Sequence, residues 1–274
     1  MTVEWLVRRG GSDSGAGGVP VLLLHGVPQT GAMWAPLVAL LGDRRTLVPD
    51  LPGLGGSGPA PAYDVVSLAA ELAALVAAEV PGVDGRPGRV DVVGHDWGGI
   101  LALALAGHHP ERVRRLAVAN APYRHIDPTR AWHVPLAALP WLPERLLTPR
   151  AVRWGIAHVW RSPVPPSREL LDRYAAAYDD PARVRATLAY YRAAARHTDR
   201  RLRMTGMPDV APTEALVVWG AEDPVLPLAI GESVVRGIAA RVPAVRMVTV
   251  PGAGHFVVDE APEVVLPVLA DFLA

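Results

Sequence analysis

The stretch of sequence that decides the fold is Val92-Val93-Gly94-His95-Asp96-Trp97-Gly98-Gly99. It follows a short apolar run, opens a helical pattern and has the form Gly-x-nucleophile-x-Gly, with Asp96 where serine is more usual. Glycines suit this form because a tight, strained turn between strand and helix leaves no room for side chains. The pattern predicts that Asp96 is held as a nucleophile at a helix N-terminus, where the helix dipole stabilises negative charge. The alternative is that Asp96 only caps the helix.

On both sides of this turn, apolar runs alternate with helical patterns. The runs predicted as strands are residues 21–24, 46–48, 90–93, 116–119, 216–219 and 246–250. The segments predicted as helices are residues 67–80, 98–107, 230–241 and 262–273. Near-continuous Val and Leu runs are typical of parallel strands that are covered on both faces. The alternation therefore predicts an α/β fold, with a mostly parallel central sheet flanked by helices.

The middle of the chain has a different composition. Residues 123–207 contain no good strand run and are rich in Arg, Trp, Tyr, Pro and Ala, with helix-like stretches such as residues 181–196. We interpret this region as a helical lid inserted into one core domain, with its arginines on a solvated face. The predicted division is core 1–123, lid 124–207 and core 208–274.

Two further polar residues follow predicted strands, where open α/β sheets form their binding sites. Asp223 comes just after the run at 216–219, and His255 just after the run at 246–250. The chain order nucleophile, acid, histidine is that of a hydrolase triad. We therefore predict a triad of Asp96, Asp223 and His255, with Glu222 as the alternative acid.

The chemistry of an Asp nucleophile differs from that of serine. Attack by a carboxylate on an ester returns an anhydride, whereas attack on a saturated carbon bearing a leaving group gives an alkyl-enzyme ester. His255 would then activate water for hydrolysis of this ester, oriented by Asp223. The backbone N–H groups of Val27 and Trp97 are the predicted oxyanion hole for that second step.

With these motifs the chain resembles the epoxide hydrolase and dehalogenase branch of the α/β-hydrolase superfamily. The resemblance covers nearly the whole chain and implies a cis Val27–Pro28 peptide bond and the α/β-hydrolase fold. Its anchors are His25-Gly26-Val27-Pro28, Gly53-Leu54-Gly55-Gly56-Ser57, residues 94–99, Asn120-Ala121-Pro122, Asp223 and His255.

The resemblance also implies which lid side chains assist the leaving group. Epoxide hydrolases commonly use two lid tyrosines to bind the epoxide oxygen; Tyr191 fits the second, and His133 stands where the first is expected. A minority of these enzymes pair a lid His with a lid Tyr. Neighbouring helical positions point about 100° apart, so Tyr190 competes with Tyr191 for the site. The predicted pocket lining is Pro28, Trp97, Tyr190 and Trp132.

The dehalogenases of this branch give the main alternative. Fluoroacetate dehalogenases have a similar lid but also need arginines just after the nucleophile, where this chain has uncharged residues 97–100. Many haloalkane dehalogenases have Asn at the position of Val27. Some dehalogenases, and the epoxide hydrolases with a lid His and Tyr, carry the acid at the position of Asn120, whereas the acid is assigned here to Asp223, as in many epoxide hydrolases. We therefore favour an epoxide hydrolase that forms a vicinal diol. The alternatives are a haloalkane or haloacid dehalogenase and, beyond these, a non-catalytic ligand-binding or lyase-like protein.

Composition limits the other possibilities. The 274 residues have a formal net charge of zero, no cysteine and no lysine. This excludes disulfides and thiolate chemistry and gives no reason to expect nucleic acid or an anionic membrane as partner. We find no signal peptide or membrane-spanning run, so a cytoplasmic enzyme is the expectation. We expect a small-molecule substrate, no metal and no organic cofactor; the oligomeric state cannot be deduced.

Overall fold

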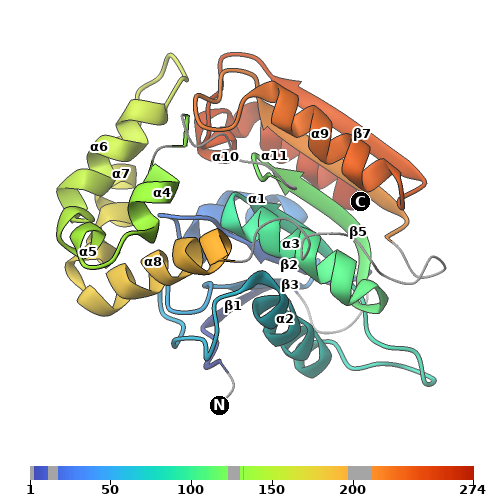
Figure 1. Cartoon of the computed structure of the whole chain (residues 1–274). Coiled ribbons are helices and arrows are strands. Elements are labelled where there is room, and N and C mark those ends of the chain that lie inside the picture. The colour runs from blue at the N-terminus through green and yellow to red at the C-terminus, as the bar shows by residue number, and fades with distance from the viewer. Residues whose placement is uncertain (1–2, 12–17, 123–129, 132, 197–211) are drawn as a thin grey trace.

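A mostly parallel sheet forms the centre of the computed structural model, which describes residues 3–11, 18–122, 130–131, 133–196 and 212–274. Within these residues seven strands pair in the order β1-β3-β2-β4-β5-β6-β7 (Figure 1). Only the pair of β1 with β3 is antiparallel. The strands are β1 (Val7–Gly10), β2 (Val21–Leu24), β3 (Thr46–Pro49), β4 (Val90–His95), β5 (Val113–Ala119), β6 (Glu214–Gly220) and β7 (Ala244–Val250).

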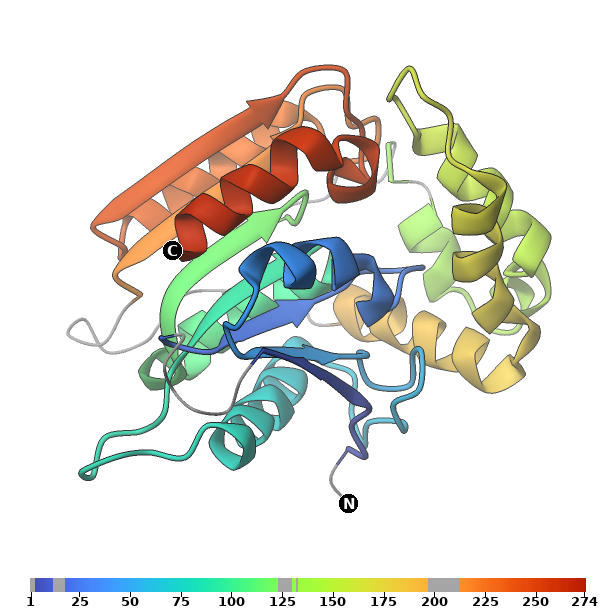
Figure 2. The ribbon, with the colours of Figure 1, turned by 180° about the vertical axis from the view of Figure 1, so that it is seen from behind.

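Helices cover both faces of this sheet. Helices α2 (Val65–Glu79), α3 (Trp97–His108) and α9 (Leu228–Ala239) lie on the face turned to the viewer in Figure 1. Helices α1 (Ala35–Leu41) and α11 (Pro262–Leu273) lie on the opposite face (Figure 2), and the short α10 (Val257–Glu260) precedes α11. Two clusters of buried apolar side chains, one on each face, fill the space between helices and sheet. Burial of these clusters is the main stabilising contribution to the fold.

The six predicted strands and four predicted core helices are all present in the described residues. Strand β1 was not predicted, because Val7-Arg8-Arg9-Gly10 has no apolar run. It is the antiparallel edge strand, and Arg8 holds the buried Asp50 through paired contacts of 2.7 and 3.1 Å. Charged side chains are common on such edges, where they prevent pairing with other chains.

The region between β5 and β6 is helical in its described part. Its helices are α4 (His133–Ala138), α5 (Leu142–Leu146), α6 (Pro149–Val159), α7 (Arg168–Ala175) and α8 (Pro181–Arg196). They gather at the end of the sheet where the parallel strands finish (Figure 1). Both predicted domain boundaries, 123/124 and 207/208, lie outside the described residues, so the division into core and lid stays a prediction.

Candidate active site

The turn at Asp96 joins β4 to α3 through a strained backbone. Asp96 has a φ of 49°, and a Cβ atom on Gly98 would collide with the carbonyl of Leu24. A side chain on Gly94 would collide with the backbone of Gly98 itself, so neither position accepts another residue without a backbone shift. The Asp96 side chain makes no capping bond to α3. The alternative that this residue serves as an ordinary helix cap is therefore wrong.

The Asp96 carboxylate is instead held by groups from two other loops. One oxygen, Oδ2, accepts a hydrogen bond of 2.9 Å from the backbone N–H of Val27. The other, Oδ1, lies 3.6 Å from Nε2 of His255. Burial alone would raise the pKa of this carboxyl group, but the bond to His255 and the N–H of Val27 lower it below its ordinary value. Asp96 is therefore charged and directed by two donors.

His255 lies between two carboxylates. Its Nδ1 is 2.8 Å from Oδ2 of Asp223, and its Nε2 faces Asp96. Burial would lower the pKa of this imidazole, but Asp223 and Asp96 outweigh burial and raise the pKa to about 10. The structure thus brings together the three side chains that were predicted as a triad, and the ring is an imidazolium while both carboxylates are charged.

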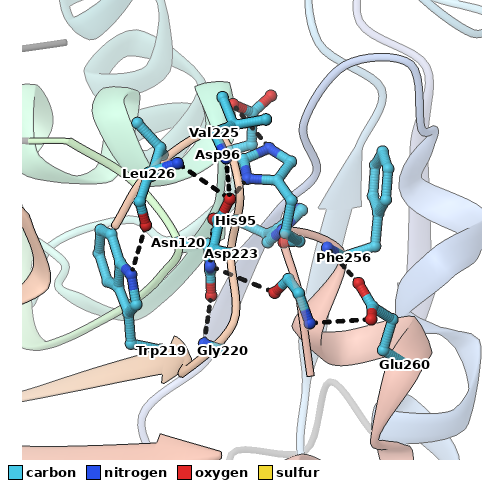
Figure 3. Close-up of polar contacts among 12 residues, drawn as sticks. His95, Asp96, Asn120, Trp219, Gly220, Asp223, Val225, Leu226, Phe256 and Glu260 are labelled. Atoms are coloured by element: carbon cyan, nitrogen blue, oxygen red, sulfur yellow. Dashed lines mark hydrogen bonds and ion pairs between the residues drawn. The ribbon is translucent and has the colours of Figure 1, made fainter. Parts of the chain in front are cut away.

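Asp223 is positioned by a dense set of donors. Its Oδ1 accepts from the N–H groups of Val225 at 2.8 Å and Leu226 at 2.9 Å, and its Oδ2 accepts from the amide of Asn120 at 2.6 Å (Figure 3). Asp223 is buried, whereas its neighbour Glu222 is exposed. The geometry therefore favours Asp223 over Glu222 as the acid.

The sequence analysis assigns Asn120 no contact, but names it as an anchor of the resemblance and as a position where some relatives carry an acid. In the structure it is fully buried, with a φ of 40°. Its Oδ1 accepts from the N–H of Gly220 at 3.0 Å while its Nδ2 donates to Asp223 (Figure 3). Asn120 therefore fixes both the carboxylate and the end of β6, a role that an ionised acid could not fill because it has no N–H to donate.

Glu260, at the end of α10, holds the loop that carries His255. Its buried carboxylate accepts four backbone N–H groups, two from that loop and two from the segment that follows α6. The donors are Gly254 at 2.8 Å, Phe256 at 3.0 Å, Arg161 at 2.7 Å and Ser162 at 2.9 Å. Figure 3 shows the two bonds to the histidine loop. This role could not be predicted from the sequence, because backbone donors leave no residue pattern.

His133 and Tyr191 approach the nucleophile from α4 and α8. Their ring centroids are 6.1 Å apart, and the ring of Tyr191 lies 5.3 Å from that of Trp97. Burial lowers the pKa of His133, helped by the charge of His255. Burial also raises the pKa of Tyr191, helped by Asp96 and opposed by a hydrogen bond from the side chain of Trp97. A neutral His133 and a protonated Tyr191 thus lie beside the charged Asp96.

The comparisons with known proteins identify the family of the chain. Residues 21–268 match the model of the alpha/beta hydrolase family. The chain belongs to this family. A fluoroacetate dehalogenase from a Burkholderia species is 30% identical over 275 residues, covering 95% of this chain and 88% of the relative. Epoxide hydrolase 3 of Xenopus tropicalis is 28% identical, covering 92% of this chain and 71% of the relative.

Solved structures give the same result for the α/β-hydrolase fold. Cfl2 from Burkholderia cenocepacia superimposes with a TM-score of 0.80 at 26% identity, over 99% of this chain and 92% of the Cfl2 chain. The predicted fold and the resemblance to the epoxide hydrolase and dehalogenase branch are thus confirmed. The Val27–Pro28 bond of this α/β-hydrolase is cis, as the resemblance implied.

The other predicted pocket residues of this α/β-hydrolase differ in how they are placed. Tyr190 is fully buried, with its hydroxyl bonded to the carbonyl of Pro52 at 3.0 Å and its ring 5.2 Å from that of Trp97. Pro28 is partly buried in the oxyanion loop, the segment of residues 25–28 that follows β2 and contains Val27. Trp132 lies outside the described residues. The N–H of Val27 binds Asp96, as an oxyanion hole would require.

One residue near the site was not predicted. Tyr178 is almost fully buried, and its hydroxyl lies 3.3 Å from Oγ1 of Thr187. Thr187 lies on α8, one helical turn before Tyr191. Burial raises the pKa of Tyr178, and the charge of Asp96 raises it further. A third hydroxyl therefore lies within electrostatic range of the nucleophile.

Two absences apply to the described part of the α/β-hydrolase. No group of three or more His, Cys, Asp or Glu side chains there is arranged to hold a metal ion. No helix in that part of the chain is long and apolar enough to span a membrane.

Proposed function

We propose that this α/β-hydrolase attacks a saturated carbon with Asp96 and that its substrate is an epoxide, which it converts to a vicinal diol. The observation that carries the proposal is the site of Asp96: a charged carboxylate directed by Val27 and His255, with His133 and Tyr191 beside it. A carboxylate nucleophile faced by two neutral hydrogen-bond donors suits a leaving group that stays attached and becomes an alkoxide.

In the first step an oxygen of Asp96 bonds to one epoxide carbon while the bond from that carbon to the epoxide oxygen breaks. The electron pair stays on the oxygen, where hydrogen bonds from His133 and Tyr191 stabilise the developing charge. Tyr191 passes its proton to the alkoxide, and its phenolate regains a proton from the imidazolium of His255 through solvent.

In the second step water attacks the carbonyl carbon of the Asp96 ester. The ester has no charge, so one of the two carboxylates that raise the pKa of His255 is gone, and the neutral imidazole can accept a proton from water. The N–H of Val27 stabilises the oxyanion, and collapse of the tetrahedral intermediate releases the diol and restores the carboxylate.

Two features argue against the dehalogenase alternatives. Residues 97–100 carry no charge that could pair with a haloacid carboxylate. The side chain of Val27, at a position where many haloalkane dehalogenases have Asn, has no hydrogen to donate to a halide. The similarity to a fluoroacetate dehalogenase keeps halide release as the competing outcome of the tests.

The direct test is a single turnover in water enriched in ¹⁸O, with enzyme in excess over a terminal epoxide. We expect the first diol to contain only ¹⁶O and the peptide containing Asp96 to gain ¹⁸O, because the oxygen added to carbon comes from the carboxylate. Mass spectrometry of the isolated diol and of the Asp96 peptide measures the two labels. Label in the first diol, with none in the peptide, would show direct attack by water and end the proposal.

Tyr191→Phe should slow ester formation by about 100-fold while hydrolysis of the preformed ester changes little, because the tyrosine proton is needed only when the ring opens. Rapid quenching followed by intact-protein mass spectrometry separates the two rates. Tyr190→Phe is the matched control: it removes the bond to Pro52, lowers stability by about 1 kcal/mol and leaves ester formation intact. If Tyr191→Phe slowed only the hydrolysis of the ester, the proposed role of Tyr191 in ring opening would be wrong.

A further inference from the structure

A chain of hydrogen-bonded polar groups runs from the backbone carbonyl of His255 to helix α7. Nε2 of His95 lies 2.8 Å from the carbonyl oxygen of His255, and Nδ1 of His95 lies 2.8 Å from Oε1 of Gln29. The amide nitrogen of Gln29 lies 2.7 Å from Oδ2 of Asp259, and both oxygens of Asp259 lie 3.1 Å from the hydroxyl of Tyr174. His95, Gln29 and Tyr174 are each at most 1% exposed, and Asp259 is partly exposed.

The chain joins four separate parts of the fold. His95 ends β4 beside the nucleophile, Gln29 follows the oxyanion loop, Asp259 lies in α10, and Tyr174 lies in α7. None of these side chains is used in the proposed reaction. Their hydrogen bonds nevertheless end on the carbonyl of His255. The protonation state of these side chains therefore affects the position of the catalytic base.

Counting hydrogens shows that the chain needs one titratable proton. The carbonyl of His255 accepts only, so Nε2 of His95 must carry hydrogen. If Nδ1 also carries hydrogen and donates to Gln29, His95 is a buried imidazolium and Asp259 is ionised. If Nδ1 carries none, the Gln29 amide must turn its NH₂ to His95 and its oxygen to Asp259, which then must be a carboxylic acid. The orientation of an amide is assigned from such networks, so both arrangements fit the same heavy atoms.

Without that proton every arrangement sets two lone pairs against each other. A neutral His95 with hydrogen on Nδ1 faces the carbonyl of His255 with a bare Nε2 at 2.8 Å. With hydrogen on Nε2 instead, either bare Nδ1 faces Oε1 of Gln29 or the reversed amide oxygen faces a carboxylate oxygen at 2.7 Å. Each of these arrangements therefore lacks at least one hydrogen bond of the series.

We propose that Asp259 is a positioning residue that acts as a neutral carboxylic acid, donating to Gln29 and thereby keeping the hydrogen of His95 on Nε2, bonded to the carbonyl of His255. This arrangement leaves the chain uncharged. The other arrangement would bury an imidazolium against His255, which is itself an imidazolium between its two carboxylates in the resting enzyme.

The surroundings of both titratable groups favour the neutral arrangement. Burial and the charge of His255 together lower the pKa of His95 to about 4, against the opposing effect of Asp96 and Asp223. Burial raises the pKa of Asp259 to about 6, against Gln29, Tyr174 and Arg173, with Glu260 adding to the increase. Folding therefore takes up a proton at Asp259, and this contribution to stability is lost as pH rises through that pKa.

The test compares the wild-type enzyme with Asp259→Asn, whose amide donates to Gln29 at every pH. Asp84→Asn is the matched control, since Asp84 is exposed and its φ of 51° is one that asparagine tolerates. Infrared difference spectra between wild type and Asp259→Asn should show a protonated carboxyl band at about pH 5. Nitrogen-15 NMR of labelled histidine, with His95 assigned through its loss in His95→Gln, should show hydrogen on Nε2 in both proteins at that pH.

The kinetic arm of the test rests on the proposed function and measures hydrolysis of the Asp96 ester. As pH rises and the carboxyl band disappears, the wild-type rate should fall relative to that of Asp259→Asn by about tenfold, the equivalent of one buried hydrogen bond. Taking this ratio cancels the titration of His255, which both proteins share.

Three results would overturn the inference. These are a carboxylate band for Asp259 at about pH 5, hydrogen on Nδ1 of His95 in Asp259→Asn, and a rate ratio that stays constant while the band disappears. If no ester forms in any variant, the proposed function fails, and the infrared and NMR results still decide the state of Asp259.

Discussion

Asp96→Ala should abolish turnover, with kcat/KM falling by on the order of 10⁵-fold. The proposed reaction makes and breaks a covalent bond to this carboxylate, and no other described carboxylate lies at the elbow between β4 and α3. A water molecule in place of the Asp96 side chain would not be held covalently at the elbow, so it would attack the substrate far more slowly. Diol formation from a panel of epoxides, followed by chromatography, measures the loss.

The control for this experiment must separate lost chemistry from lost folding. Circular dichroism of Asp96→Ala should match that of the wild type, whereas its free energy of unfolding should fall by about 1 kcal/mol, because the variant loses the hydrogen bond from Val27 and the contact with His255. Asp271→Asn, a change at an exposed position of α11, should keep full activity. Activity within about tenfold of wild type in Asp96→Ala would mean that the carboxylate is not the nucleophile.

His255→Gln should stop the reaction at the ester, with hydrolysis slowed by about 10³-fold and ester formation retained. Glutamine cannot take a proton from water, whereas the attack by Asp96 needs no base. Intact-protein mass spectrometry after incubation with epoxides and haloalkanes measures the adduct. A gain equal to the whole epoxide indicates ring opening, and a gain equal to the haloalkane minus hydrogen halide indicates dehalogenation.

The matched control for that variant is His158→Gln, a change to an exposed histidine that stacks on Trp154 in α6. It should turn over normally and show no adduct. Adducts in both His255→Gln and His158→Gln would indicate adventitious alkylation. Such adducts would also form on the double variant His255→Gln with Asp96→Ala. Loss of the adduct in that double variant is the expected result.

Most of the sheet could be predicted because its central strands are buried on both faces and read as continuous apolar runs. Strand β1 could not, because an edge strand with two arginines is defined by its pairing with β3 and by the salt bridge of Arg8 to Asp50. Such pairing is a tertiary contact that no local pattern encodes.

The candidate site divides in the same way. Asp96, Asp223 and His255 could be predicted as site residues, since each follows a strand that an apolar run predicts. Asn120 and Glu260 could not, because their amide or carboxylate acts on backbone groups or side chains far away in the chain. The choice between Tyr190 and Tyr191 also depends on the rotation of α8, which the sequence alone leaves open.

The carboxylate of Glu260 has a consequence for protein engineering. It binds the backbone on both sides of His255 and also the backbone at Arg161 and Ser162, after α6. The helices between β5 and β6 are therefore not an exchangeable cassette. A chimera that takes these helices from another α/β-hydrolase inherits a working base only if the donor chain returns two N–H groups to that carboxylate. Designers who wish to change substrate range should thus vary side chains within α4 and α8 and keep the backbone at residues 161–162.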